Sequence, residues 1–406
     1  MLLAEPASSY VPAAPPLLDP ALEPIADQVL AGGRLAAEQA LQLYRSWDVH
    51  TLFWLAHHDR TRRHGRKSFY NINRHINYTN LCVLRCKFCA FYRPYSKTAP
   101  APDAYELEPG QIVQTALDAY EAGATEIHMV GGLHPTLPFD WYIRLLADLR
   151  SACPRLHIKA FTAIEILHLC KMARPRLTIE QCLRELRAAG LDSLPGGGAE
   201  IFDDRVHDQA FKNKPGATGW FDVHRSAHEL GICSNVTMLY GHIETDEQRI
   251  AHLLRIREHQ DQSRSERSAR FNACIPLSFI PDGSEFEREG LQGPTGLTDL
   301  RTLAIARLVL DNVDHIKAFW IMQSPKLAQV ALASGCDDLD GTVQWYDITR
   351  REGVATDVNH QELPVEKLER LIVEAGLEPV ERDSLYRRVV RGPGGPMDWT
   401  IQTQGD

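Results

Sequence analysis

Apolar residues recur along the chain with two alternating periods, one typical of strands and the other typical of helices. Residues 35–64 carry a helical pattern. From residue 69 onward, short apolar runs of strand type alternate with helical segments of about 10 to 15 residues. The predicted strands occupy residues 69–78, 126–132, 155–162, 191–198, 233–241, 271–279 and 315–322. The predicted helices occupy residues 109–123, 139–152, 178–190, 219–231, 245–260 and 298–312.

Strands that alternate with helices pair in parallel through right-handed crossovers. The number of units favours an α/β fold, a partial or irregular (β/α) TIM-like barrel, over an open doubly wound sheet. We expect an N-terminal arm with helices over residues 1–64, a barrel core over 65–322 and a C-terminal extension over 323–406. An amphipathic helix at 363–376 and a short strand at 384–391 are predicted within that extension.

Composition narrows the class of protein. Of 406 residues, 44% are hydrophobic and 24% charged, which is typical of a globular chain. A net charge of −9 argues against a nucleic-acid partner. The absence of a run of about 18 apolar residues argues against a membrane span. The Pro- and Ala-rich first 20 residues lack the cationic start of a signal peptide, so we expect a surface arm and a cytoplasmic location.

Three of the nine cysteines, Cys82, Cys86 and Cys89, follow the first predicted strand in a C-x3-C-x2-C spacing. In (β/α) barrels the loops after the strands build the active site. A structural zinc site would need a fourth ligand from elsewhere in the chain. A cubane iron–sulfur cluster normally takes four cysteines, so three would leave one iron free to be chelated by a small molecule. Both metal interpretations stay open on the spacing alone.

With Phe88 before the last cysteine, the spacing resembles the signature of radical S-adenosylmethionine (SAM) enzymes. The resemblance implies one [4Fe–4S] cluster held by the three cysteines, SAM bound at the free iron, and a low-potential electron donor such as flavodoxin or ferredoxin. It further implies cofactor-binding roles for a small set of residues: Phe88, the strand-end glycines Gly131 and Gly132, Glu200 at the ribose, and Gly241 with Glu244 near the adenine. Read without the resemblance, the glycines are a tight turn, Glu200 is a solvated loop carboxylate, and Glu244 favours a helix start.

Several blocks over about residues 65–355 resemble the aminofutalosine synthases of the futalosine route to menaquinone: "NRHINYTN", "LPGGGAEIF", "TMLYGHIET", "IPLSFIP" and "LAQVALASGCDDLDGTV". The resemblance implies that the enzyme adds the 5′-deoxyadenosyl radical to the dicarboxylate aromatic ether 3-[(1-carboxyvinyl)oxy]benzoate. Rearrangement and loss of a carboxylate would then give 6-amino-6-deoxyfutalosine. The alternatives are the cyclic dehypoxanthinylfutalosine synthase of the same route and a non-enzymatic electron-transfer or metal-stabilised module.

A dianionic substrate requires cations and hydrogen-bond donors inside the barrel. Strand alternation places His75, Asn77 and Thr79 on the predicted interior face and Arg74 on the other. We predict His75, Asn77 and His128 as catalytic, with Arg74 and His134 as further candidates. The polar stretch 261–270, where family members carry a shorter glycine-containing segment, is predicted to be a surface loop. The aspartates of "CDDLDGTV" resemble a calcium loop only loosely, because Ile348 stands where the last ligand would be.

Overall fold

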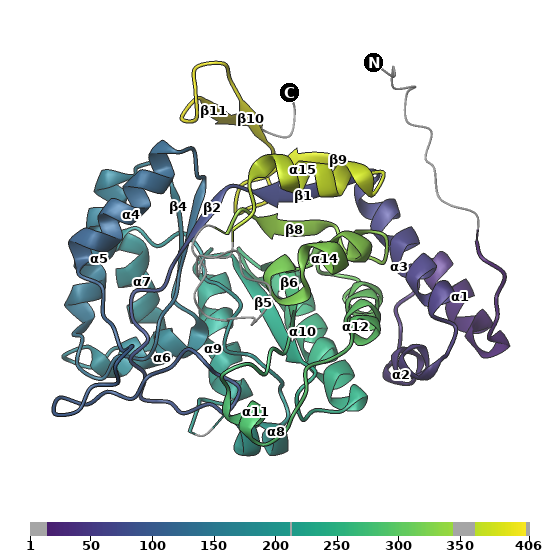
Figure 1. Ribbon diagram of the computed structural model, residues 1–406, viewed down its shortest axis with the longest axis horizontal. Helices are drawn as coiled ribbons and strands as arrows, with labels where there is room; N and C mark the ends of the chain where they lie inside the picture. The colour runs from purple at the N-terminus through teal and green to yellow at the C-terminus, as the bar shows by residue number, and fades with distance from the viewer. Residues whose placement is uncertain (1–13, 212, 344–361, 403–406) are drawn as a thin grey trace.

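The computed structural model describes residues 14–211, 213–343 and 362–402. Residues 1–13 of the predicted arm and Ile348 of the aspartate block lie outside these ranges. A ring of parallel strands surrounded by helices forms the body of the described chain (Figure 1). Within the described residues, no helix combines the length and the apolar character needed to cross a membrane.

The strands follow one another around the ring. β1 (Lys67–Asn71) and β2 (Asn73–Ile76) form one extended stretch; β1 pairs in parallel with β8 (Asp338–Gly341), and β2 with β3 (Glu126–Met129). β3 pairs with β4 (His157–Ala160), and β5 (Ser234–Tyr240) pairs with β6 (Phe271–Ser278), which pairs with β7 (His315–Ile316). Single parallel bridges make the remaining joints: Lys159 with Ser193, Leu194 with Ser234, and Lys317 with Asp338. The predicted irregular (β/α) barrel is confirmed.

Helices cover the outer face of the ring. They are α4 (Pro109–Glu121), α5 (Phe139–Ala152), α6 (Ala163–Met172), α7 (Ile179–Ala189), α9 (Ala217–Glu229), α10 (Asp246–Glu266), α12 (Gly296–Val309) and α14 (Pro325–Leu332). Side-chain caps define several starts, because they satisfy backbone N–H groups that have no partner within the helix. Thr178 accepts from the Gln181 amide, and Thr245 accepts from the Gln248 amide. Helix α6 lacks the one-sided apolar pattern and escapes sequence detection, since most of its residues are buried.

Four sequence expectations were wrong in detail. Residues 315–322 are not one strand: β7 ends at Ile316 and the short helix α13 (Trp320–Gln323) follows. Residues 191–198 contribute only single bridges to the ring. The stretch 261–270 is a loop only in part, because α10 continues to Glu266 and residues 267–270 alone connect it to β6. Within 384–391, only β10 (Val389–Arg391) is a strand, and it pairs antiparallel with β11 (Trp399–Ile401).

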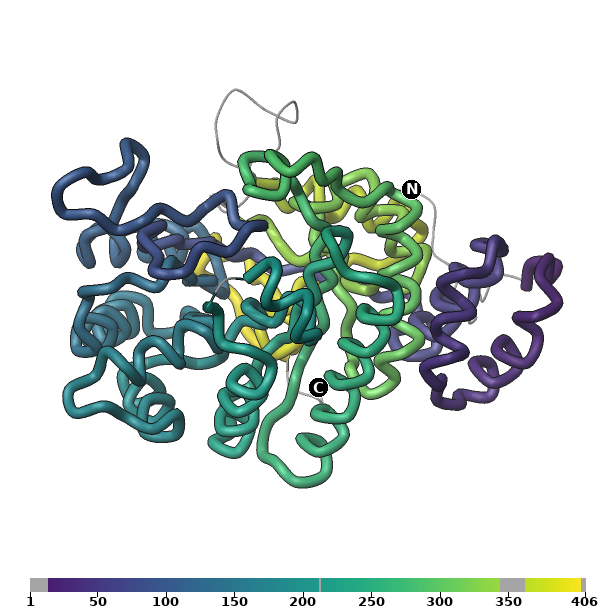
Figure 2. Tube along the Cα trace, turned by 90° about the horizontal axis from the view of Figure 1, so that it is seen from below, coloured from purple at the N-terminus to yellow at the C-terminus, as the bar shows by residue number. Residues whose placement is uncertain are grey.

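Segments at both ends of the chain attach to the barrel. The 3-10 helix η1 (Pro20–Leu22) leads into α1 (Glu23–Leu30) and α2 (Ala37–Arg45), which lie to one side of the ring, and α3 (Val49–His64) packs on α12 (Figures 1 and 2). Helix α15 (Val365–Glu374) leads into β9 (Glu378–Glu381), which pairs with the outer edge of β1. Both β8 and β9 lie beyond residue 322, so residues assigned to the C-terminal extension pair with the first barrel strand.

Candidate active site

The loop that carries the three cysteines, residues 80–93, follows β2 and is fixed mainly by backbone hydrogen bonds. The Arg93 amide donates to the Asn80 carbonyl at 2.7 Å, and the Cys82 amide donates to the Arg93 carbonyl at 2.9 Å. The Cys89 amide donates to the Cys86 carbonyl at 3.1 Å. The Asn80 side chain anchors the loop from outside by donating to the Asp103 carbonyl at 2.8 Å. We refer to residues 80–93 as the cysteine loop.

The thiols of Cys82, Cys86 and Cys89 lie close enough to influence one another. Burial raises the pKa of Cys86 to about 12, the Lys214 charge opposes this rise, and the neighbouring Cys89 and Cys82 add to it. Within the described chain, the one group of three or more ligand atoms lying within 4.8 Å of one another is His64, His315 and Asp337.

Beyond the end of β3, Gly132 packs directly against the cysteine loop, and Gly131 packs against Tyr78, just before that loop. A Cβ on Gly132 would stand 2.3 Å from the Leu81 carbonyl oxygen, and one on Gly131 would stand 2.7 Å from the Tyr78 ring. The Gly132 amide donates to the Thr79 carbonyl at 2.8 Å. Their lack of a side chain is therefore required for the fit of the loop. Their predicted contact with SAM stays a prediction.

Glu165, which sequence reasoning missed, ties these parts together. Its carboxylate accepts from the Tyr78 hydroxyl at 2.8 Å, from the Gly131 amide at 3.0 Å and from the Thr162 amide at 2.7 Å. Burial raises the pKa of Glu165 to about 7, against the opposing effect of these hydrogen bonds. The only signal in the sequence was the Thr162–Glu165 capping box of the undetected helix α6.

Glu200 and Phe88 both line the barrel cavity, as a cofactor site near the cysteines would require. Glu200 forms a buried ion pair with Lys214, whose ammonium lies 5.4 Å from the centre of the Phe88 ring. Glu200 is therefore not a solvated loop carboxylate. Lys214 is a further residue that sequence reasoning missed. It lies in a loop outside the sequence stretches that resemble the aminofutalosine synthases. Its charge acts on all three cysteines of the loop.

Gly241 and Glu244 form a tight turn after β5 and do not line the cavity. Glu244 accepts from the Gly241 amide at 2.5 Å, from the His242 amide at 2.9 Å and from the Arg249 guanidinium at 2.6 Å. Gly241 has a φ of 89°, a conformation that favours glycine. Both carboxylate oxygens of Glu244 are thus engaged within the protein, where they shape the turn. The position of Glu244 near the adenine of SAM remains a prediction.

The barrel encloses a cavity of about 260 Å³ that reaches the cysteine loop at Phe88, Cys89 and Ala90. Apolar side chains form much of its wall, among them Leu239, Ile275, Leu277, Phe279, Phe319 and Met322. His75 and His128 line it, and their rings stack with centres 4.5 Å apart. Burial lowers the pKa of His75 to about 4 and that of His128 well below its usual value, so both are neutral near pH 7.

The other predicted polar residues lie outside the cavity wall. Asn77 donates its side-chain amide to the Val130 carbonyl at 3.1 Å, which holds the ends of β2 and β3 together. His134 is buried, and its Nδ1 accepts from the Leu137 amide at 3.1 Å. Neither Asn77 nor Arg74 belongs to the residues that line the cavity. Of the three residues predicted as catalytic, the structure brings His75 and His128 together.

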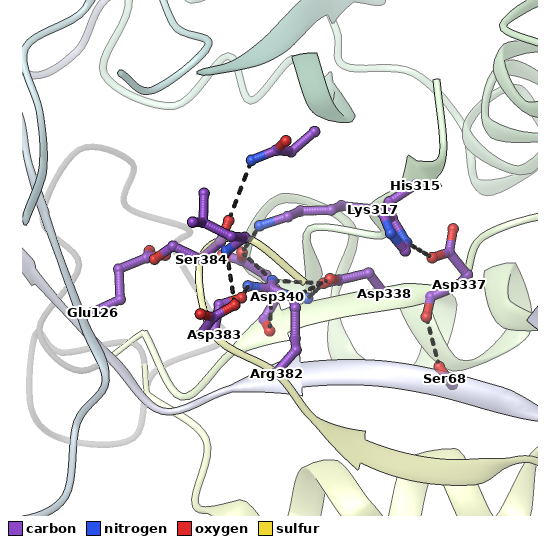
Figure 3. Close-up of polar contacts among 12 residues, drawn as sticks. Ser68, Glu126, His315, Lys317, Asp337, Asp338, Asp340, Arg382, Asp383 and Ser384 are labelled. Atoms are coloured by element: carbon purple, nitrogen blue, oxygen red, sulfur yellow. Dashed lines mark hydrogen bonds and ion pairs between the residues drawn. The ribbon is translucent and has the colours of Figure 1, made fainter. Parts of the chain in front are cut away.

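A group of charged and hydrogen-bonded residues borders the cavity through Lys159, Lys317 and Asp340. We call this group the floor network; its other members are Glu126, Asp338, Arg382 and Ser384, and Figure 3 labels all of its members except Lys159. Lys159 pairs with Glu126 at 2.6 Å and Lys317 with Asp340 at 2.5 Å. Arg382 pairs with Asp338 at 2.6 Å. Burial alone would raise the pKa of Asp340, but the Lys317 and Arg382 charges outweigh it and lower that pKa to about 2. Asp340 is therefore ionised at neutral pH.

His64, His315 and Asp337 are spaced like metal ligands, but they bind other protein groups. The Arg307 guanidinium binds Asp337, and His64 Nε2 lies 2.9 Å from the Asp314 carbonyl oxygen. His64 therefore uses this nitrogen as a donor, which leaves it no lone pair for a metal. The cluster joins α3 to β7 and β8 and is structural. The aspartate block likewise contributes Asp337, Asp338 and Asp340 to ion pairs with basic side chains rather than to a calcium loop.

Comparison with known proteins agrees with this geometry. A model described as the radical SAM superfamily matches residues 76–256, and one described as the CofH/MqnC C-terminal region matches residues 268–391. The chain is 44% identical to an aminodeoxyfutalosine synthase of Thermus thermophilus over 373 residues, 91% of this chain and 96% of the relative. The chain belongs to the radical SAM superfamily. Cys82, Cys86 and Cys89 lie within the first matched range, and membership implies a [4Fe–4S] cluster, SAM, a reductant and a small-molecule substrate.

This radical SAM enzyme also has relatives with other names. It is 34% identical to a cyclic dehypoxanthine futalosine synthase of Streptomyces coelicolor, over 91% of this chain and 89% of the relative. It is 36% identical to a 5-amino-6-(D-ribitylamino)uracil–L-tyrosine 4-hydroxyphenyl transferase of Methanopyrus kandleri, over 91% of this chain and 97% of the relative. Among solved structures, methylornithine synthase superposes with a TM-score of 0.67 at 16% identity, covering 87% of this chain and 97% of that one, which supports the fold.

Proposed function

We propose that this enzyme is an aminodeoxyfutalosine synthase. It adds the 5′-deoxyadenosyl group of SAM to 3-[(1-carboxyvinyl)oxy]benzoate, and rearrangement with loss of one carboxylate gives 6-amino-6-deoxyfutalosine. The observation that carries the proposal is the 44% identity to the Thermus thermophilus synthase over nearly the whole of both chains. The cavity supports it, because its apolar wall suits an aromatic ring and its charged floor suits carboxylates.

The proposed roles of the residues follow from their positions relative to the cysteine loop and the cavity. Cys82, Cys86 and Cys89 would hold three irons of the cluster, which when bound supplies the electron that cleaves SAM. Phe88 and Glu200 border the cavity next to the cysteine loop, where the nucleoside part of SAM would lie. Gly131 and Gly132 bring the end of β3 against that loop, and Gly241 with Glu244 shape the turn after β5. A flavodoxin- or ferredoxin-type protein in the cytoplasm would supply electrons.

His75 and His128 are the proposed catalytic residues that face the reacting end of the substrate. Both are neutral, so each ring presents one N–H donor and one acceptor nitrogen without adding charge. Such a pair orients an ether oxygen or a carboxylate by hydrogen bonding while the wall of the cavity excludes water. Asn77 positions them indirectly, because it fixes the end of β2, which carries His75, to β3, which carries His128.

The decisive experiment is anaerobic incubation of the reconstituted enzyme with SAM, dithionite and the enol-pyruvyl ether, followed by mass spectrometry. We expect an adenosyl adduct with the mass of 6-amino-6-deoxyfutalosine and stoichiometric methionine. Formation of 5′-deoxyadenosine alone from an enzyme with full iron content would contradict the proposal. A spiro product from dehypoxanthine futalosine would instead assign the cyclic synthase activity, which the 34% relative carries in its name.

A further inference from the structure

The floor network is the one part of the cavity wall that carries ammonium groups. Lys159, on β4, and Lys317, next to β7, both line the cavity. Each is only 3% exposed. Burying an ammonium group is expensive unless it is paired, and each has one carboxylate partner: Glu126 for Lys159 and Asp340 for Lys317. A protein that needed only a stable barrel interior would fill these positions with apolar side chains.

The carboxylate partners are themselves held from behind, by the C-terminal segment. Ser384 donates to the Glu126 oxygen that also receives Lys159, and Arg382 lies 3.8 Å from an Asp340 oxygen while it pairs with Asp338 (Figure 3). Glu126 lies outside the cavity wall, whereas Asp340 lines the cavity beside Lys317. Each ammonium has three N–H groups, and within the described chain each donates one to its acid. The remaining N–H groups are free to meet an anionic ligand in the cavity.

The two lysines reach the cavity from different elements. Lys159 is in register with His128, which is in register with His75, so these three side chains share one level of the barrel. Lys317 belongs to the other set of strands and is bridged to Asp338. The cavity thus presents two separate cationic points beside a neutral imidazole pair. A ligand with two carboxylates on an apolar body could pair with both lysines, whereas a ligand with a single negative charge could pair with only one of them.

We propose that Lys159 and Lys317 bind the carboxylates of the substrate and select for a dicarboxylate. This inference rests on the proposed function, since it assigns the anion contacts of the same cavity. The acids Glu126 and Asp340, supported by Ser384 and Arg382, position the two ammonium groups. Substrate specificity would then reside in residues that lie far from the cysteine loop in the sequence and that play no part in SAM cleavage.

The test uses the reconstituted enzyme and the variants Lys159→Met and Lys317→Met, with Lys326→Met, an exposed lysine on α14, as the matched control. Loss of a charge-assisted hydrogen bond should raise the Kd of the ether, measured by calorimetry without reductant, by about 10- to 100-fold. KM should rise in parallel. Dithionite-driven SAM cleavage without substrate should stay at the parent rate. In two analogues of the ether, one of the two carboxylates is replaced by a carboxamide, and the parent enzyme should bind both analogues more weakly than the ether. Each lysine variant should bind one of these two analogues as tightly as it binds the ether itself.

Removal of one lysine leaves a buried acid unpaired, so the paired variants Lys159→Met/Glu126→Gln and Lys317→Met/Asp340→Asn accompany the single ones. Variants with full iron content and parent-like Kd values for the ether would overturn the inference while leaving the proposed function intact. A parent enzyme that neither binds the ether nor converts it would overturn the proposed function, and the inference with it. Loss of discrimination between acid and amide, with SAM cleavage unchanged, supports the assignment.

Discussion

The cysteine loop and the floor network meet the same cavity but are built on opposite principles. The cysteine loop is fixed mainly by backbone hydrogen bonds, some within the loop, such as Asn80 with Arg93, and some to remote residues, such as Val83 with Leu133. The floor network is fixed by side-chain ion pairs between distant residues, and its Ser384–Glu126 contact spans 258 positions. Backbone hydrogen bonds do not depend directly on side-chain identity, whereas a substitution at one floor residue leaves its charged partner unpaired. We propose cofactor chemistry for the first region and substrate choice for the second.

The largest effect should follow from removal of a cluster ligand. Cys86→Ala should reduce both iron binding and SAM cleavage to background, because a cubane held by two thiolates is not retained. Cys233→Ala removes a cysteine outside the cysteine loop and should leave both unchanged. Iron content and visible absorbance after anaerobic reconstitution provide the measurement. A Cys86→Ala protein with parent iron content would show that the loop does not hold the cluster.

In the floor network, Arg382→Met should destabilise the protein by about 3–5 kcal/mol, because it leaves Asp338 buried and unpaired. The double variant Arg382→Met/Asp338→Asn should recover much of this loss. Arg370→Met, which breaks an exposed pair on α15, is the control and should leave stability near that of the parent. The measurement is urea denaturation followed by circular dichroism. Equal destabilisation in the single and double variants would show that packing, not charge pairing, holds the floor.

A pH effect distinguishes the two regions further, because Glu165 supports the cysteine loop with a raised pKa. Its pKa rises from 4.5 in the unfolded chain to about 7 in the fold, so its stabilising contribution is complete below pH 4.5. That contribution is lost as pH rises to about 7, by about 3 kcal/mol at most. Glu165→Gln should remove this part of the pH dependence. Parallel stability curves for parent and variant between pH 5 and pH 8 would contradict the assignment.

The smallest effect should come from Gly132→Ala. Its new Cβ would press on the Leu81 carbonyl oxygen and shift the cysteine loop, at a cost of about 1–3 kcal/mol. SAM cleavage should fall while substrate affinity, which we assign to the floor network, stays near the parent value. Gly110→Ala, at a helical position with open space around it, serves as control. If Gly132→Ala weakened substrate binding more than SAM cleavage, the separation between loop and floor would fail.

The barrel and the position of the cysteine loop could be predicted because both depend on local pattern. Apolar periodicity located the strands, and the C-x3-C-x2-C spacing stood directly after the first of them. Details failed where tertiary contacts override pattern. Residues 315–322 are apolar enough for a strand, yet β7 covers only two of them, and one further bridge at Lys317 precedes α13. The stretch 261–270 is polar, yet its first part stays helical because Asp261 and Arg264 bond to the Asn312 side chain and carbonyl, respectively.

The candidate site divides in the same way. The cysteines, Phe88 and the histidines His75 and His128 were named from the sequence, and all of these meet at the cavity or at the loop beside it. Lys159, Lys317 and Lys214 were not named, because a lone lysine in a strand or loop has no pattern that separates it from a surface residue. Arg382 and Ser384 were overlooked for the same reason.

By itself, the sequence determined the alternation of strands and helices, the three-cysteine motif and the radical SAM chemistry that this motif supports. These features follow from spacing, which a linear chain records directly. Only the tertiary structure decided which charges face the cavity, because the C-terminal segment must return to the base of the first strands before Arg382 and Ser384 can meet Asp338 and Glu126. An ion pair forms only when the two charged groups lie close together, and for residues that are remote in sequence the fold sets that distance.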